Sequence, residues 1–220
     1  HPDTQPAAIR ARARASTDPL DPVHLFDMSW YHEGAIPHVL LPPSLTGVKA
    51  NILVMSAKHF PTGSHKVGPA YSCVRERLLS AEITPDGSTL VFPSTGNYGI
   101  GGAWVGPRLG FRSLVVLPED MSAERFEKIA AYGASVIKTH GSESNVKEIY
   151  DAVRELNKRP NHTILNQFAD FGNYRFHHRV TGNSALELAK GYGNRRIAAF
   201  VSAMGSAGTI AAADRIKQAF

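Results

Sequence analysis

One lysine of this sequence lies where its side chain can act as a nucleophile. The turn Pro61-Thr62-Gly63-Ser64-His65-Lys66 ends in Lys66, directly before a stretch with helical spacing. The positive potential at the start of a helix favours the neutral amine of a lysine, and a neutral amine reacts with a carbonyl to give an imine. The alternative is that Lys66 is an ordinary solvated surface lysine, and this alternative is favoured when the turn is considered by itself.

A run of small residues near the end of the sequence has the composition of an anion-binding turn. It follows an apolar run at residues 198–202, precedes a stretch with helical spacing, and reads Gly205, Ser206, Ala207, Gly208 and Thr209. Small side chains let the backbone curl around an anion so that its free N–H groups point inward. The nucleotide-binding pattern GxxxxGKS/T is absent. A tight turn without a ligand explains the segment equally well, so both explanations stay open.

Polar residues follow two further apolar runs. Ser94-Thr95-Gly96-Asn97-Tyr98 comes after the run at 89–92, and Gln167 comes after the run at 163–165. Hydroxyl groups, amides and the free N–H groups at a helix start are donors suited to a carboxylate. A cluster that only caps its own helix explains the first segment as well, and a loop hydrogen bond explains Gln167.

These residues need a scaffold, and the pattern of apolar runs predicts one. The predicted strands are 51–55, 89–92, 113–117, 135–138, 163–165 and 198–202, and the predicted helices are 66–80, 96–109, 122–132, 145–158, 174–190 and 207–219. Such alternation is typical of an α/β fold with a parallel sheet covered by helices on both faces. Parallel sheets bind ligands beyond the C-terminal ends of their strands, where the candidate segments fall.

The composition excludes several classes of protein. Of the 220 residues, 43% are hydrophobic and 20% are charged, which is typical of an ordered globular chain. The single cysteine, Cys73, excludes a disulfide framework. The net charge of +5 suits a small anionic ligand but is too low and too scattered for nucleic acid. His177 and His178 are adjacent on a predicted helix and point in different directions, so we expect packing or surface positions and no metal.

The first residues have a different character from the rest. Arg10, Arg12 and Arg14 alternate with alanines, which predicts an arm or a partly ordered tail. No apolar stretch of signal-peptide type follows these arginines, and no apolar run is long enough to span a bilayer. We therefore expect a cytoplasmic protein without a membrane partner.

Taken in order along the chain, these segments resemble the fold-type II pyridoxal-phosphate enzymes, the group of cysteine synthase, cystathionine β-synthase, threonine dehydratase and the tryptophan synthase β-subunit. Residues 61–66 resemble that family's PTGSxK segment, residues 94–101 its SGNTGIG loop, and residues 205–209 its glycine-rich phosphate loop. Residues 117–125 with Gly133-Ala134 resemble its MPxxMSxER…GA segment, and Asn166-Gln167-Phe168 resembles its QF segment. Ordered matches over about residues 50–215 are more specific than any single one.

The resemblance implies pyridoxal 5′-phosphate (PLP) as cofactor and a role for each segment. Lys66 would carry the cofactor as an imine and shuttle the α-proton of the substrate. Asn97 would hydrogen-bond the pyridine hydroxyl. The residues expected to hold the substrate carboxylate are Ser94, Thr95, Gly96, Tyr98 and Gln167. The residues expected to hold the cofactor phosphate are Gly205, Ser206, Ala207, Gly208 and Thr209.

The resemblance also implies a two-lobed, three-layer αβα protein with parallel-rich sheets, like the tryptophan synthase β-subunit. The expected divisions are an N-terminal arm at 1–44, the first part of a large lobe at 45–84, a small mobile lobe at 85–194 and the returning large lobe at 195–220. Family members continue well past the phosphate loop, where they place the group that faces the pyridine nitrogen. We therefore expect the C-terminal part of the large lobe to be missing, and residues 1–220 alone to bind PLP weakly or not at all.

The implied reaction is β-elimination from an amino acid with a leaving group on Cβ, followed by addition of a nucleophile, as in cysteine synthase. The segments at 99–101 and 121–125 favour the cysteine synthase and cystathionine β-synthase branch. Elimination alone, with release of ammonia and a 2-oxo acid, is one alternative, and a non-catalytic relative is another. The expected partners are a small amino acid substrate and a second copy in a homodimer.

Three departures from the family pattern bear on the substrate more than on the cofactor. Val67-Gly68 follow the lysine where the family often has Asp-Arg. Tyr98 replaces a threonine, and residues 170–173 replace an Asn-Pro turn.

Overall fold

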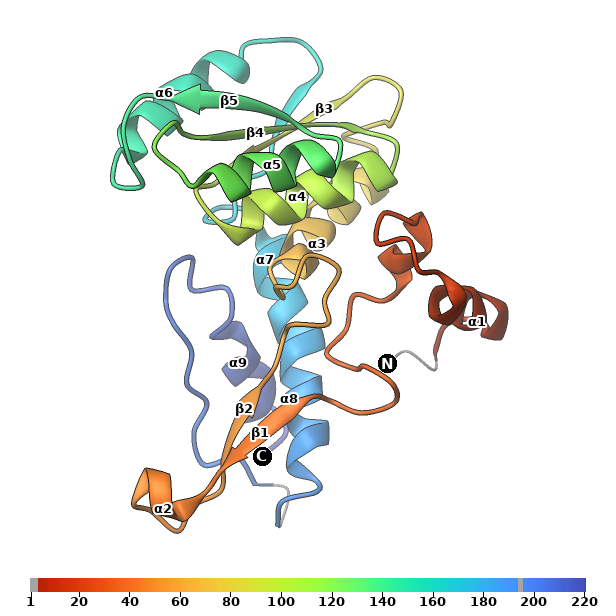
Figure 1. Ribbon diagram of the computed structural model, residues 1–220, viewed down its shortest axis with the longest axis vertical. Coiled ribbons are helices and arrows are strands. Elements are labelled where there is room, and N and C mark those ends of the chain that lie inside the picture. The colour runs from red at the N-terminus through yellow and green to blue at the C-terminus, as the bar shows by residue number, and fades with distance from the viewer. Residues whose placement is uncertain (1–3, 194–195) are drawn as a thin grey trace.

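The computed structural model describes residues 4–193 and 196–220 (Figure 1). Its strands are β1 His38–Leu41, β2 Ile52–Met55, β3 Thr89–Pro93, β4 Arg112–Pro118, β5 Ser135–Thr139 and β6 His162–Ile164. Its α-helices are α1 Ala7–Ala15, α2 Pro43–Thr46, α3 Val67–Leu79, α4 Asn97–Arg108, α5 Ala123–Ala131, α6 Val146–Leu156, α7 Phe171–Phe176, α8 Gly182–Ala189 and α9 Ala211–Lys217. A short 3₁₀ helix covers Pro22–Phe26, and a π-helical turn covers His177–Thr181.

Four parallel strands form the main sheet, in the order β5-β4-β3-β6. Helices α4 and α5 cover one face, where Ile100 and Ile129 pack on Val115, and α6 covers the other, where Ile149 packs on Val116 (Figure 1). The central strands β3 and β4 carry apolar side chains toward both helical layers, since both faces of a parallel sheet of this kind are covered by helices. The predicted parallel sheet with helices on both faces is confirmed.

The order of the strands reverses beside β3. The chain runs outward from β3 through β4 to β5 and then returns through α6 to place β6 on the other side of β3. β3 and β6 are neighbours, so the loops that follow them start side by side and run in different directions. Ligands of open α/β sheets usually bind in the crevice at such a reversal. This reversal brings Ser94–Gly96 and Asn166–Gln167 to the same sheet edge.

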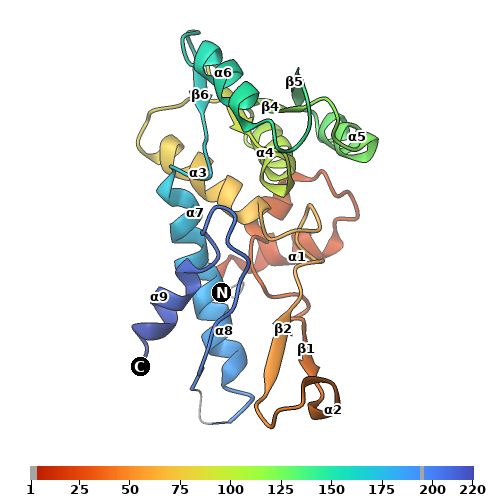
Figure 2. The ribbon, with the colours of Figure 1, turned by 90° about the vertical axis from the view of Figure 1, so that its left-hand side faces the viewer.

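A helical layer below this edge carries the remaining segments. Helix α3 packs between α4 and α7, and the close approach depends on Gly68, where a Cβ would lie 2.0 Å from the Phe176 ring. Helix α7, the π-helical turn and α8 continue one another as a rod, with α9 alongside (Figure 2). An antiparallel pair, β1 and β2, extends from this layer with α2 near its tip (Figures 1 and 2).

One expectation about secondary structure is wrong. The N-terminal arm stays a prediction, and it contains α1 and the 3₁₀ helix, since alanine and arginine favour helix, while Leu25 and Trp30 are buried in the core. The predicted strand at 198–202 is not a strand. A strand requires a neighbour for its backbone hydrogen bonds, and Val201 is instead 89% exposed with no ladder partner in the described chain.

The last helix begins later than expected. It starts at Ala211 and not at Ala207, because Ala207 adopts a left-handed conformation with a φ of 57°, which a right-handed helix cannot contain. The division into lobes stays a prediction, and its boundary at residues 194–195 lies outside the described residues. None of the helices in the described part of the chain has the length and apolar character needed to cross a membrane.

Candidate active site

Lys66 lies where three of the predicted segments meet. It directly precedes α3, and its Nζ atom donates to Oγ of Ser206 at 3.2 Å and to Oε1 of Gln167 at 3.5 Å. Burial lowers the pKa of Lys66 below that of a free lysine, because an ammonium ion loses its hydration there. Burial thus shifts the protonation equilibrium of Lys66 toward the neutral amine, and its two hydrogen-bond partners are neutral acceptors.

A glycine in α4 sets the position of the Lys66 backbone. A Cβ on Gly101 would lie 2.9 Å from Cα of Val67 and 3.1 Å from the carbonyl oxygen of Lys66. Only glycine permits this approach of α3 to α4 without displacing main-chain atoms. The turn before Lys66 is also held from α5, where Nζ of Lys128 donates to the carbonyl oxygen of Thr62 at 3.3 Å.

The turn at 205–209 presents a hydroxyl group whose oxygen is crowded by donors. Oγ of Ser206 accepts from Lys66, from Nδ2 of Asn173 at 3.0 Å and from the backbone N–H of Gly208 at 3.4 Å. A hydroxyl oxygen has two lone pairs and one hydrogen, so the two closer donors, Lys66 and Asn173, already fill its acceptor capacity and the Gly208 contact is weaker. The Ser206 hydrogen is therefore left to donate to an acceptor in the site.

Asn173 joins two of the predicted segments, and the sequence reasoning did not select it. Its Nδ2 atom donates to the carbonyl oxygen of Gln167 at 2.9 Å as well as to Ser206. The side chain is 2% exposed, and its Oδ1 atom has no hydrogen-bond partner among the described residues. A Cβ on Gly208 would lie 2.2 Å from this Oδ1 atom, so the turn can approach only through glycine. The available signal was a polar residue in the helix that follows Gln167.

The loop after β3 supplies donors at the sheet edge. Ser94 is buried, and its Oγ atom accepts from the backbone N–H of Gly96 at 3.2 Å. Thr95 donates to Oε1 of Glu143 at 3.4 Å, and Asn97, the first residue of α4, is exposed.

The ring of Tyr98 points into the core and not into the opening. It is 1% exposed and packs against Phe92, and burial raises the pKa of its hydroxyl group well above the ordinary value. Only the backbone N–H of Tyr98 remains for the predicted contact with a carboxylate. The thiol of Cys73 lies behind it, and burial raises its pKa to about 12, so Cys73 is no nucleophile here.

Two neutral histidines lie behind Lys66. His65 stacks on Trp30 with ring centroids 5.7 Å apart, and His177 contacts His65 at 5.2 Å. Burial lowers the pKa of His65 to about 4 and that of His177 to about 2, with the Lys66 charge acting in the same direction. His177 is thus a packed residue, one of the two positions expected for it.

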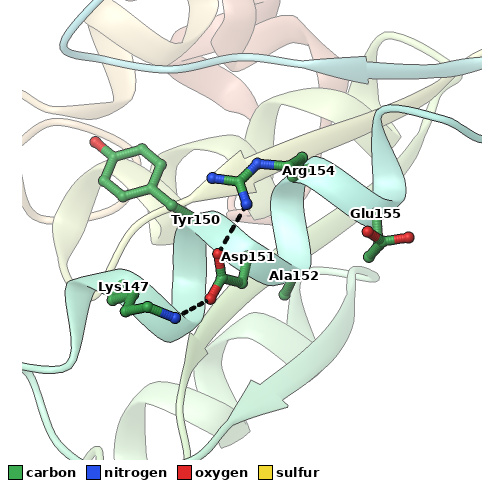
Figure 3. Close-up of a pocket in the computed structure, with 6 residues that line it drawn as sticks. All are labelled: Lys147, Tyr150, Asp151, Ala152, Arg154 and Glu155. Carbon is green, nitrogen blue, oxygen red and sulfur yellow. Dashed lines mark hydrogen bonds and ion pairs between the residues drawn. The ribbon is translucent and has the colours of Figure 1, made fainter.

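A separate hollow on the outside of the molecule takes no part in this arrangement. It has a volume of about 910 Å³, and its lining residues all come from α6 (Figure 3). Asp151 there already pairs with Lys147 at 2.5 Å and with Arg154 at 3.1 Å (Figure 3). Glu155 pairs with Lys158 beside the hollow, and none of these ion pairs includes a predicted site residue.

Comparison with known proteins gives consistent matches. Residues 30–215 match the family described as pyridoxal-phosphate dependent enzyme. The chain is 34% identical to cystathionine beta-synthase of Saccharomyces cerevisiae over 177 residues, which covers 76% of this chain and 34% of that protein. It is 31% identical to cysteine synthase of Staphylococcus aureus over 183 residues, which covers 83% of this chain and 57% of that protein.

A solved structure shares the fold. The O-acetylserine dependent cystathionine beta-synthase of Helicobacter pylori superposes with a TM-score of 0.73 at 24% identity, covering 83% of this chain and 59% of that one. The chain thus spans between one third and three fifths of the length of these relatives. The family match extends over most of the chain and includes Lys66, Gln167 and Ser206. The chain belongs to the family of pyridoxal-phosphate dependent enzymes.

Proposed function

We propose that the protein containing this chain uses PLP to eliminate a leaving group from Cβ of a small amino acid and then adds a nucleophile, as a cysteine synthase does. The observation that carries the proposal is the position of Lys66, whose amine lies within hydrogen-bond reach of both Gln167 and Ser206. An amine between a carboxylate-binding loop and a phosphate-binding turn is the arrangement that this chemistry requires.

The residues present fit the cofactor. The turn at 205–209 offers the free Ser206 hydrogen beside backbone that only glycine can bring close, which suits a phosphate. Lys66 has a lowered pKa and can react with an aldehyde as the neutral amine. When bound, PLP withdraws electrons from Cα of the substrate and so makes its proton acidic.

The chain's own residues then have separate tasks. Lys66 holds the cofactor and afterwards takes and returns the proton at Cα. Asn97 donates to the ring hydroxyl. The carboxylate of the substrate is held by the side chains of Ser94, Thr95 and Gln167 and by the backbone N–H groups of Gly96 and Tyr98. Gly205, Ser206, Ala207, Gly208 and Thr209 hold the phosphate.

The names of the relatives support the reaction class. Cystathionine beta-synthase and cysteine synthase are both named for the amino acid that they make. The proposal takes this protein to be a PLP-dependent lyase or transferase of the cysteine synthase kind, and a cytoplasmic homodimer whose small lobe closes over the substrate to exclude water.

The test uses the full-length protein. Its absorption spectrum should show a band near the edge of the visible range, and reduction with borohydride should fix the cofactor on the peptide that contains Lys66. Lys66→Ala should lose both the band and the modified peptide. Lys58→Ala, at an exposed lysine of the same region, is the matched control and should keep them. Modification of another lysine, or a band that persists in Lys66→Ala, contradicts the assignment.

A second measurement separates replacement from elimination. With O-acetylserine and sulfide the protein should form cysteine faster than it forms pyruvate and ammonia. Pyruvate formation that sulfide does not suppress would identify an elimination enzyme, and no turnover with any β-substituted amino acid would identify a non-catalytic relative.

A further inference from the structure

A chain of hydrogen-bonding groups runs from the N-terminal region to the turn at 205–209. Nε1 of Trp30 donates to Oγ1 of Thr181 at 2.8 Å. The same Thr181 oxygen lies 2.9 Å from Nδ1 of His177. On the other side of the ring, Nε2 of His177 lies 3.5 Å from Oγ1 of Thr209. These residues come from distant parts of the sequence and form one path.

The path is closed to solvent except at its end. Trp30 is 5% exposed, Thr181 1% and His177 0%, whereas Thr209 is partly exposed on the turn. His177 and Thr181 are the first and last residues of the π-helical turn, which aligns their side chains on one face. Such π-helical turns are rare in proteins as a whole, and those that occur are often found at functional sites. A buried polar path that reaches solvent only at the turn can orient a hydrogen-bonding group of the turn toward a ligand bound there.

The chemistry of the groups gives this path a direction. An indole N–H can only donate, so Thr181 accepts from Trp30 and its own hydrogen is available for Nδ1 of His177. Burial keeps the His177 ring neutral, with a pKa of about 2, so the ring has one hydrogen. With Nδ1 as acceptor, that hydrogen is on Nε2 and points to Oγ1 of Thr209. The Thr209 hydrogen is then free for an acceptor outside the path.

The opposite direction would leave a phosphate facing a lone pair. If Nε2 of His177 lacked the hydrogen, the Thr209 hydroxyl would donate inward and present its oxygen to the anion. In that arrangement Oγ1 of Thr181 would accept from both Trp30 and His177, and its own buried hydrogen would have no acceptor among the described residues. An unpaired buried donor is costly, so the arrangement in which Thr181 donates to His177 is favoured.

We propose that Trp30, Thr181 and His177 are positioning residues that keep the Thr209 hydroxyl turned outward as a hydrogen-bond donor to the phosphate of the cofactor. This inference rests on the proposed function. It extends the cofactor site to Trp30 and Thr181, which lie behind the turn and do not face the cofactor.

The test compares two ligands that differ only in the phosphate. Dissociation constants of PLP and of pyridoxal, which lacks the phosphate, are measured by absorption on the full-length protein. Thr181→Val removes the hydroxyl at nearly constant shape. It should weaken PLP about tenfold and leave pyridoxal unchanged, because the lost donor acts only on the charged group. Trp30→Phe should shift the ratio in the same direction, and Thr181→Ser should restore it.

A buried threonine at the other end of the sheet is the matched control. Oγ1 of Thr89 accepts from Nε of Arg112 at 3.2 Å, and Thr89→Val should leave the ratio of the two dissociation constants at the wild-type value. The inference is overturned if Thr181→Val weakens the binding of PLP and pyridoxal equally, or weakens neither. If Thr181→Val does not fold, an unchanged ratio of the two dissociation constants in Trp30→Phe overturns it. A wild-type protein that binds no PLP overturns the proposed function as well, whereas normal PLP binding with an unchanged ratio overturns only this inference.

Discussion

The Nζ atom of Lys66 lies 3.2 Å from the Oγ atom of Ser206, although 140 residues separate them in the sequence. Lys66 directly precedes α3, and Ser206 lies in the turn before α9. Helix α7 connects the two, because α3 packs along it and Asn173 within it donates to Ser206.

Asn173 should support both the stability and the cofactor affinity of the protein. Asn173→Ala removes the donor shared by Gln167 and Ser206 at a buried position. We expect the free energy of unfolding to fall by about 1–3 kcal/mol and PLP to bind more weakly. Urea denaturation and a PLP titration measure the two effects. The control is Asn183→Ala, which removes an exposed asparagine on α8 and should change the free energy of unfolding and the PLP affinity much less. An Asn173→Ala protein with wild-type stability and wild-type PLP affinity would contradict this role of Asn173.

Gly101 should be needed for the position of Lys66. In Gly101→Ala the new methyl group meets the main chain of Val67 and Lys66 at 2.9–3.1 Å, so α3 must move. We expect a loss of about 1–3 kcal/mol in stability and a lower fraction of protein carrying the cofactor. Thermal unfolding and the absorption band report these quantities. At Gly191 a new Cβ would meet its nearest neighbour at 3.6 Å, so Gly191→Ala is the control, and equal behaviour of the two variants would count against this role.

The buried histidines should make the protein sensitive to acid. The pKa of His65 is lowered from 6.5 to about 4 in the folded state, so the unfolded chain binds more protons between these values. Stability therefore rises with pH across this window and falls on acidification, by roughly 3 kcal/mol for a shift of this size. His177, lowered to about 2, adds in the same direction.

The measurement is the melting temperature between pH 7.5 and 4.5. His65→Gln should flatten the decrease, while His140→Gln, whose ring is 89% exposed, controls for the substitution itself. An equally steep decrease in His65→Gln would show that acid sensitivity has another origin.

Ala207 should carry backbone strain in the turn at 205–209. Its φ of 57° is unfavourable for a residue with a Cβ, so Ala207→Gly should raise stability by about 1 kcal/mol, and the β-branched Ala207→Val should lower it. Ala81 has a φ of 58° at an exposed position away from the site and is the matched control. Both Ala207→Val and Ala81→Val should lower the stability of the protein, but only Ala207→Val should weaken PLP binding. Calorimetry measures the stability, and a PLP titration measures the binding. Weaker PLP binding in Ala81→Val would contradict a local effect of the turn.

Elements with strong local signals could be predicted from the sequence. The apolar runs of β3 and β4 and the glycine after α5 gave boundaries within a residue or two of the observed ones. The segment at 198–202 is as apolar as a strand, but strand formation depends on a neighbour that the segment itself does not specify. Helix α1 was missed because alternation of alanine and arginine offers no apolar face, and none of its residues is buried.

The site was predictable to the extent that its residues are close to recognisable turns. The sequence located Lys66, Gln167 and Ser206, and the structure brings them together. The sequence did not predict the roles of Asn173, Thr181 and Trp30, because these roles depend on contacts between distant parts of the chain. The Trp30–Thr181 bond, for example, spans 151 positions, and no local pattern encodes such a partner.

The separation of Lys66 from Ser206 has a consequence for biosynthesis. Closing a segment of 140 residues costs roughly 4 kcal/mol of chain entropy, which only extensive packing can repay. At roughly 5–20 residues per second, the ribosome releases Lys66 about 7–28 s before Ser206. On the proposed function, the coenzyme site is therefore completed late during translation, once the turn before α9 has emerged.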